Sequence, residues 1–349
     1  MLFNRSIRNL PGASVALLIT VFLLSGNALA QTSDAPAQTS GLTVEQKLEL
    51  AIRKIDSQDF REVERLINEV AVEKPNTEKL KLARGLYFVA TKRFVEAVAE
   101  LENYNMKASG DYRGYAAVGD LYIRSRMYSS ALVPLERAKD LAPTKDNGKS
   151  VKSEILINLA TTQLGLQNNK TAVKIAKEAQ SFAPDDGQIV LRVAEIAANA
   201  GDQDVSLAAV EQAILLFKSD IRDDPFNRSA HEQLIQCYRI ASSINDSQRN
   251  ADPENPEPYV RATRAMLAAS EIERRISMLD AHRFLQQAIE RAPKNAEYRL
   301  MLADLEYDIG GIKDSEVALD EVLTGDPKNA RALELKEKFS KSPPRPTLP

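Results

Sequence analysis

The sequence predicts an all-α protein in which helix hairpins stack side by side as an α-solenoid of about seven to eight helix–turn–helix repeats. The first observation is a fixed period: Phe60, Phe94 and Tyr128 are equally spaced, and the tetrapeptide that starts at Pro293 returns at Pro327, after the same interval. A period of about 34 residues is typical of stacked helix hairpins. The second observation is the spacing of apolar residues by three and four, which favours helices. No sustained alternation predicts a strand, so no sheet is expected.

Residues 1–30 have the order of a cleavable export signal. Arg5 and Arg8 precede an apolar run over 13–24, and an Ala-Leu-Ala sequence at 28–30 supplies small residues for cleavage. The run is shorter than the roughly 20 residues that span a bilayer, and an uncleaved anchor is the alternative. Residues 31–42 are small and polar, as in a flexible linker. No later segment is apolar enough to cross a membrane, so a periplasmic or secreted protein is expected.

Residues 43–222 are expected to hold about five repeats. Thr43 and Gln46 match a capping box that begins the first helix. In the clearest repeat the paired helices are Tyr112–Arg126 and Tyr128–Leu141. Pro143 follows them because proline cannot continue a helix that needs its N–H group.

Small side chains recur where paired helices must cross closely. One position of the first helix is filled by Ala51, Gly85, Gly119, Ala160, Ala194 and Ala303. A position early in the second helix is filled by Val63, Ala97, Ala131, Ala172, Ser206, Ala281 and Ser315. Each hairpin is therefore expected to offer an apolar face to the next.

The regular pattern is interrupted over 223–258, which is expected to be an irregular repeat and loop. Arg228–Ser242 has the pattern of a first helix, but Asn245–Pro258 has loop composition. Tyr259–Arg275 is then a longer helix, which could pair backward with 228–242 or forward with 281–292. Repeats and a capping helix are expected over 259–340, and a disordered Pro-rich tail over 341–349.

The repeated positions resemble the tetratricopeptide repeat (TPR) signature. In one repeat all eight signature positions are filled, with Tyr for the usual Trp at the first, by Tyr115, Val118, Gly119, Tyr122, Ala131, Leu135, Ala138 and Pro143. The resemblance extends over about residues 44–340. It implies a solenoid whose first helices line a concave face, and a protein that binds other proteins.

No catalytic or metal-binding pattern is present, so no enzymatic activity and no cofactor are expected. His231 and His282 are the only histidines, and each is expected to be an ordinary helix residue. Cys237 is the only cysteine and is expected to be a small buried side chain. The net charge of −3 argues against a nucleic-acid partner held by a basic surface.

The resemblance also implies which side chains face the groove. They are Arg113, Asp120 and Arg124, then Asn158 and Thr161, then Arg192, Glu195 and Asn199, continued by Gln233, Gln236 and Arg239. Arginine and amide side chains suit the polar groups of a bound peptide. At the start of the groove the equivalent residues are apolar, namely Leu48, Ile52, Leu82 and Leu86. Some TPR proteins clamp a C-terminal carboxylate with five residues, of which only Asn158 and Arg192 match here.

The expected function is that of a non-catalytic scaffold in the periplasm or cell envelope, which binds partner proteins or peptides along the concave face. One alternative is a periplasmic chaperone or assembly factor for unfolded clients, which the apolar start of the groove favours. Another is an accessory subunit that positions an enzyme. The oligomeric state, the partner and the pathway are left open.

Overall fold

The computed structural model describes residues 41–108, 110–143 and 148–341. The predicted signal, residues 31–40 of the linker and residues 342–349 of the tail lie outside the described residues. Within the described part all regular structure is helical, in 15 helices and without a strand, which confirms the predicted fold class. The chain divides into two compact units, residues 1–183 and 184–349. Each unit is described by itself.

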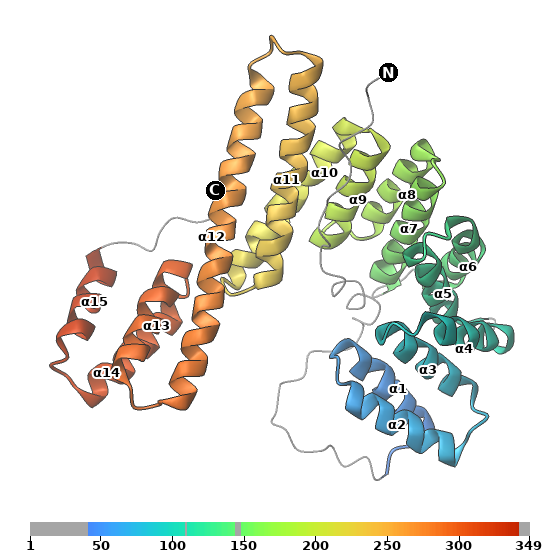
Figure 1. The fold of residues 1–349 in the computed structure, drawn as a ribbon, viewed down its shortest axis with the longest axis horizontal. Helices are drawn as coiled ribbons and strands as arrows, with labels where there is room; N and C mark the ends of the chain where they lie inside the picture. Colours follow the sequence, from blue (N-terminus) through green and yellow to red (C-terminus); the bar gives the residue numbers. More distant parts are fainter. Residues whose placement is uncertain (1–40, 109, 144–147, 342–349) are drawn as a thin grey trace. The chain divides into compact units, whose positions relative to one another are not determined.

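The first unit consists of four helix hairpins (Figure 1). Its helices are α1 (Val44–Asp56), α2 (Phe60–Glu73), α3 (Glu78–Ala90), α4 (Phe94–Lys107), α5 (Tyr112–Arg124), α6 (Tyr128–Leu141), α7 (Gly148–Gly165) and α8 (Asn169–Phe182). Each odd-numbered helix pairs with the next even one, and α1, α3, α5 and α7 contact one another in succession. This is the stacking that the fixed period of the sequence predicts.

The small residues lie at the predicted contacts between paired helices. Ala51, Gly85 and Gly119 are buried on the first helices, and Ala97 and Ala131 are fully buried on the second. A Cβ atom added to Gly119 would lie 2.4 Å from Leu135 Cγ, and one added to Gly85 would lie 2.5 Å from Leu101 Cγ. The paired helices therefore cross closely because a leucine of one helix occupies the space beside a glycine of the other.

Capping residues and left-handed turns set the helix lengths. The predicted capping box is confirmed, since Thr43 N donates to Gln46 Oε1 at 2.9 Å and Gln46 N donates to Thr43 Oγ1 at 3.3 Å. The turn inside each hairpin of the first unit contains a residue with positive φ, and these residues are Gln58, Lys92, Arg126 and Gln167. The αL conformation reverses the chain after the first helix. Its recurrence shows that the hairpins of this unit share one turn geometry.

The second unit contains longer helices. They are α9 (Gly187–Ala200), α10 (Gln203–Asp223), α11 (Arg228–Ala251), α12 (Glu257–Arg291), α13 (Ala296–Ile309), α14 (Ile312–Gly325) and α15 (Ala330–Lys341). The pairs α9–α10, α11–α12 and α13–α14 form hairpins, and α15 packs on α13 and α14. With the first unit, the described residues thus hold seven hairpins and one closing helix.

The loop predicted over Asn245–Pro258 is wrong for its first half. The helix α11 continues to Ala251, and only residues 252–256 connect it to α12. Asn245 is 4% exposed, its Nδ2 donates to Ala241 O at 2.7 Å, and its Oδ1 accepts from Arg261 Nε of α12 at 3.1 Å. Packing against α12 therefore overrides the low helix propensity of this polar segment.

The second helix predicted at 281–292 does not exist as a separate element. A single 35-residue helix, α12, includes it together with Tyr259–Arg275. Its first part packs on α11 and its last part on α13 (Figure 1), so both pairings that the sequence left open occur. Ala281 is exposed, so its assignment to the small-residue position is wrong. The predicted domain limits at 222 and 258 stay predictions, and the observed compact-unit boundary lies inside the predicted array.

Candidate functional site

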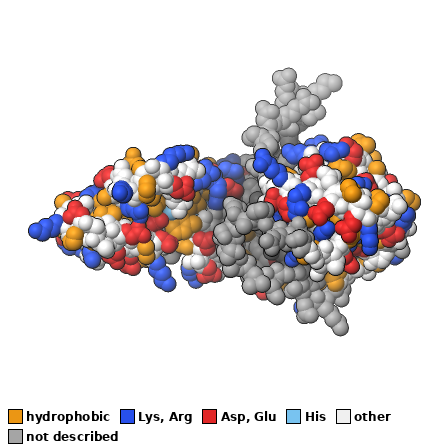
Figure 2. Space-filling view, turned by 90° about the horizontal axis from the view of Figure 1, so that it is seen from below, with side chains coloured by type: hydrophobic (Ala, Val, Ile, Leu, Met, Phe, Trp, Pro, Cys, Tyr) orange, Lys and Arg blue, Asp and Glu red, His pale blue; other side chains and the backbone are white. Residues whose placement is uncertain are grey.

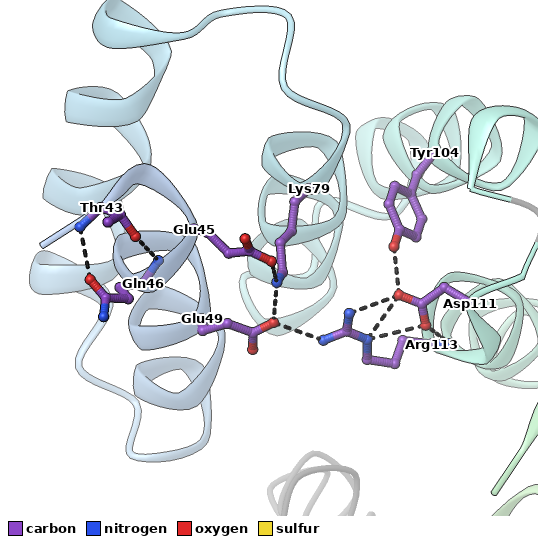
Figure 3. A network of polar contacts seen from close by, with 8 residues as sticks. All are labelled: Thr43, Glu45, Gln46, Glu49, Lys79, Tyr104, Asp111 and Arg113. Atoms are coloured by element: carbon purple, nitrogen blue, oxygen red, sulfur yellow. Dashed lines mark hydrogen bonds and ion pairs between the residues drawn. The ribbon is translucent and has the colours of Figure 1, made fainter.

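Arg113, the first residue of the predicted binding face, lies in an ionic network between the first helices of three successive hairpins (Figure 3). Its guanidinium donates to both oxygens of Asp111, with Nη2 2.8 Å from Oδ2, and Nη1 lies 3.4 Å from Glu49 Oε1 of α1. Lys79 Nζ of α3 is 2.5 Å from Glu49 Oε1 and 3.0 Å from Glu45 Oε1. The network therefore joins α1, α3 and α5.

Asp111 anchors this network because it also caps α5. Its Oδ1 accepts from Arg113 N at 2.9 Å, and its Oδ2 accepts from the Tyr104 hydroxyl at 2.5 Å. Burial by itself would raise the pKa of the Asp111 carboxyl, but the hydrogen bonds from Arg113 and Tyr104 lower it below its usual value. Burial likewise opposes the charge of Arg113, yet its bonds to Asp111 raise the pKa of the guanidinium. Both groups stay ionised at neutral pH, and a ligand carboxylate would compete with Asp111 for Arg113.

The other predicted residues of the first unit also make contacts within the fold. Asp120 and Arg124 form an ion pair on α5, with Oδ2 and Nε 2.7 Å apart. The Thr161 hydroxyl donates to Ile157 O of its own helix at 2.9 Å, and Asn158 is only 5% exposed. The structure therefore uses these polar groups largely for its own packing.

The apolar start of the groove is not an open surface. Leu48, Ile52 and Leu82 are 0% exposed and belong to the core of the first unit, while Leu86 is half-buried. The sequence predicted an accessible apolar surface here, which favoured a chaperone for unfolded clients. That prediction is wrong.

In the second unit the first three predicted residues lie on α9. The last three, Gln233, Gln236 and Arg239, lie on α11, which contacts α9. Glu195 Oε1 of α9 accepts from Gln236 Nε2 of α11 at 3.5 Å, the upper limit of a hydrogen bond. Asn199 is exposed, and its Nδ2 donates to Glu195 O at 2.8 Å. Arg192 is half-buried one turn before Glu195. Carboxyl, guanidinium and amide groups thus meet along two neighbouring first helices.

Burial dominates the electrostatics of Glu195. It raises the pKa of the carboxyl above the usual value for glutamate, while the charge of Arg192 and the bond from Gln236 act in the opposite direction. The neighbouring Cys237 thiol is fully buried, and burial with the nearby Glu195 charge raises its pKa to about 12. Cys237 is therefore an unreactive packed side chain. Glu195, in contrast, is a desolvated carboxyl that would gain from a donor on a bound partner.

Both histidines are held by contacts within the second unit. No group of three or more potential metal ligands occurs among the described residues. His231 is 0% exposed, and its Nδ1 lies 2.8 Å from Asn227 O. His282 Nε2 lies 3.0 Å from Glu306 Oε1, and the histidine ring lies against Phe226. Both histidines thus pack between helices of the second unit.

The ionic network of the first unit was missed by the sequence reasoning. Lys79 follows Glu45 by one period, and Arg113 follows Lys79 by another, so the three residues occupy one position of the repeat. The repeat places them next to one another on stacked helices. The opposite charges of Glu45 and Lys79 at that spacing were the available signal. On the face shown in Figure 2, basic and acidic side chains are interspersed, as such pairing between repeats requires.

Comparison with known proteins supports the repeat assignment in one segment. Residues 278–339 match the tetratricopeptide repeat family. This segment runs from the end of α12 to α15, so the TPR match includes the α13–α14 hairpin. No curated protein matches the sequence. No helix among the described residues is long and apolar enough to cross a bilayer.

Several solved structures have a similar arrangement of helices at low sequence identity. A MamA protein is 17% identical, over 50% of this chain and 96% of that chain, with a TM-score of 0.39. A TPR protein from Thermus thermophilus is 14% identical, over 64% and 100%, with a TM-score of 0.42. YrrB, described as a TPR protein with an unusual peptide-binding site, is 16% identical, over 55% and 95%, with a TM-score of 0.38.

Proposed function

We propose that this chain is a non-catalytic scaffold that binds proteins or peptides on the first helices of its repeats, and that α9 and α11 form its main binding face. The observation that carries the proposal is the row of polar groups contributed by Arg192, Glu195, Asn199 and Gln236. These side chains offer guanidinium, carboxyl and amide groups on adjacent helices. Such groups recognise the backbone and charged ends of extended peptides.

The same reasoning makes the first unit a weaker candidate. Arg113 is bound to Asp111 and Glu49, and Asp120 is paired with Arg124. A ligand would have to break these contacts before it gained any of its own. Glu195 is desolvated, and its hydrogen bond from Gln236 is at the distance limit. A partner that donates to Glu195 therefore displaces a weaker contact than one that binds Arg113 or Asp120.

We also propose export to the periplasm or outside the cell. The support is the arrangement of Arg5, Arg8, the apolar run and the Ala-Leu-Ala sequence, together with a single cysteine. Cell fractionation with N-terminal sequencing of the recovered protein tests this directly. A cytosolic protein that retains residues 1–30 contradicts the proposal.

The binding function is tested by affinity capture from the cell envelope followed by titration with the purified partner. Arg192→Ala and Glu195→Gln on α9 should each weaken binding about tenfold, which corresponds to about 1.4 kcal/mol. The matched controls are Arg222→Ala and Glu211→Gln, which change exposed residues of α10. Failure to recover a reproducible partner, or equal losses in the two pairs of variants, contradicts the proposal. A captured enzyme would identify the chain as an accessory subunit.

A further inference from the structure

The last three helices of the second unit share a hydrophobic core of their own. Its buried residues, all from α13, α14 and α15, are Leu300, Ala303, Leu319, Val322, Ala332 and Leu335. We call these three helices, which lie next to one another in Figure 1, the end cap. The end cap meets the rest of the unit where α13 contacts α12 and where Gly311 lies against Phe226, which precedes α11. The core of the end cap therefore does not depend on this joint.

A buried arginine of α12 crosses the joint. Arg275 Nη1 donates to Ile309 O at 3.4 Å, and Ile309 is the last residue of α13. The carbonyl groups at the end of a helix carry a partial negative charge, which favours a cation there. Burial lowers the pKa of the guanidinium, although the charge of Glu271 acts to raise it. A long hydrogen bond from a desolvated cation thus joins the α11–α12 hairpin to the end cap.

His231 of α11 is a neutral neighbour of this cation. Its Nδ1 lies 2.8 Å from Asn227 O, so Nδ1 carries the proton of the neutral ring. Its Nε2 is buried and has no hydrogen-bond partner among the described residues, so a second proton there would meet no acceptor. Burial and the charge of Arg275 lower the pKa of His231, and they outweigh Asn227 O and the charge of Asp224. The docked end cap therefore requires a neutral His231.

A second histidine acts on the joint in the opposite direction. His282 Nε2 of α12 lies 3.0 Å from Glu306 Oε1 of α13. Glu306 is buried, so a protonated His282 would form an ion pair with it and hold α13 more firmly. This gain is limited, because neutral His282 already makes the hydrogen bond. The larger effect of acid falls on His231, which has no acceptor for its second proton.

We propose that this joint is an acid-sensitive switch, in which a proton on His231 displaces Arg275 from Ile309 O and releases the end cap from the α11–α12 hairpin. Release lets Arg275 move away, so the pKa of His231 returns toward its usual value of about 6.5. The released state therefore binds a proton more readily, and its population grows as the pH falls below that value. No residue of the proposed binding face takes part, so either proposal can fail without the other.

Distance measurements by double electron–electron resonance on the full chain test the release. Spin labels at Ser247→Cys of α11 and Lys336→Cys of α15 report on the joint, since both residues are exposed. The native Cys237 is buried and stays unlabelled. From about pH 7.5 to about pH 5.5 the ratio of long to short distances should rise severalfold, toward the limit of about tenfold that one histidine sets. The control pair, Lys313→Cys with Lys336→Cys, lies within the end cap, and its distance should not change.

Two histidine variants separate release of the end cap from a general loss of structure. His231→Asn keeps a donor for Asn227 O and does not titrate, so the response to acid should disappear. His282→Gln keeps a donor for Glu306 but gains no charge, so its release in acid should exceed that of the chain with both histidines. Circular dichroism establishes that each variant is folded.

Three results overturn the proposal. The first is a joint distance that does not lengthen in acid, and the second is an equal change in the control pair, which would mean that the end cap unfolds. The third is a response of His231→Asn equal to that of the chain with both histidines. If His231→Asn does not fold, His282→Gln decides the question, since a release no greater than that of the unsubstituted joint contradicts the assigned roles.

Discussion

At the scale of single residues, stability depends on contacts that tolerate no added atom and on polar groups that have no access to water. Gly119 belongs to the first kind, because Leu135 fills the space beside it. His231 belongs to the second. Its Nδ1 is bound to Asn227 O, while its Nε2 is buried without a hydrogen-bond partner. A substitution at Gly119 and a change of pH at His231 each have an expected effect on stability.

Gly119→Ala should destabilise the first unit by about 1–3 kcal/mol, because the new methyl group would lie 2.4 Å from Leu135 Cγ. This clash should exceed the gain of about 1 kcal/mol in helix propensity that alanine normally brings. Chemical denaturation measures the difference. Gly325→Ala is the matched control, since its Cβ would meet no atom within 4 Å. If both variants gain stability, the helices of the α5–α6 hairpin do not cross this closely.

Protonation of His231 should destabilise the second unit. Burial lowers the pKa of the imidazole below its usual value, and the charge of Arg275 adds to this, although Asn227 O and Asp224 act in the opposite direction. When the pKa of a histidine is lower in the folded state, its contribution to stability is fully present at pH values above the unfolded-state pKa of about 6.5. The contribution declines as the pH falls below that value.

Urea denaturation at a series of pH values between about 7.5 and 5.5 checks this linkage. The wild-type chain should lose stability toward the acid end. His231→Asn keeps a donor for Asn227 O and does not titrate, so its stability should change less with pH, even though the smaller side chain lowers it throughout. If the free energy of unfolding changes with pH by the same amount in both proteins, His231 is not the source of the pH dependence.

At the scale of helices and hairpins, tertiary contacts decide where elements end. The polar segment after Asn245 is helical because Arg261 and the apolar side of α12 pack on it. Composition alone predicts a loop there, since Asn, Asp and Ser favour turns. The helix α12 likewise continues through the point near residue 280 where the repeat pattern expects a turn. Local sequence therefore predicted the regular hairpins well and this long hairpin poorly.

Ser247→Pro tests the helical extension directly. Ser247 is exposed and its Oγ donates to Ser243 O, so its side chain contributes little to packing. Proline inside a helix costs about 3 kcal/mol, because it removes a hydrogen bond and clashes with the preceding turn. Hydrogen exchange should show faster exchange in residues near 247, whereas the control Ser247→Ala should leave exchange unchanged. A loop at this position would tolerate both substitutions equally.

At the scale of the whole molecule, one repeat length recurs in both units. Contacts between residues one period apart include Lys79 with Glu45, Arg239 with Glu273 and Lys338 with Asp304. The period was readable in the sequence because the close crossing of the two helices in each hairpin demands a small residue at the same position each time. The binding face was less predictable. The sequence does not distinguish a charged helix residue that pairs with a neighbouring repeat, as Arg113 does, from one that binds a partner protein.

The shared position of Glu45, Lys79 and Arg113 has a consequence for how such an array can lose a repeat. Excision of residues 79–112 would join Glu78 to Arg113 and bring that arginine to the place of Lys79, where Glu45 and Glu49 would meet a cation as before. Loss of this one period therefore preserves the opposite charges between α1 and the helix that follows it. A deletion of another length would move Arg113 away from the position that faces Glu45 and Glu49.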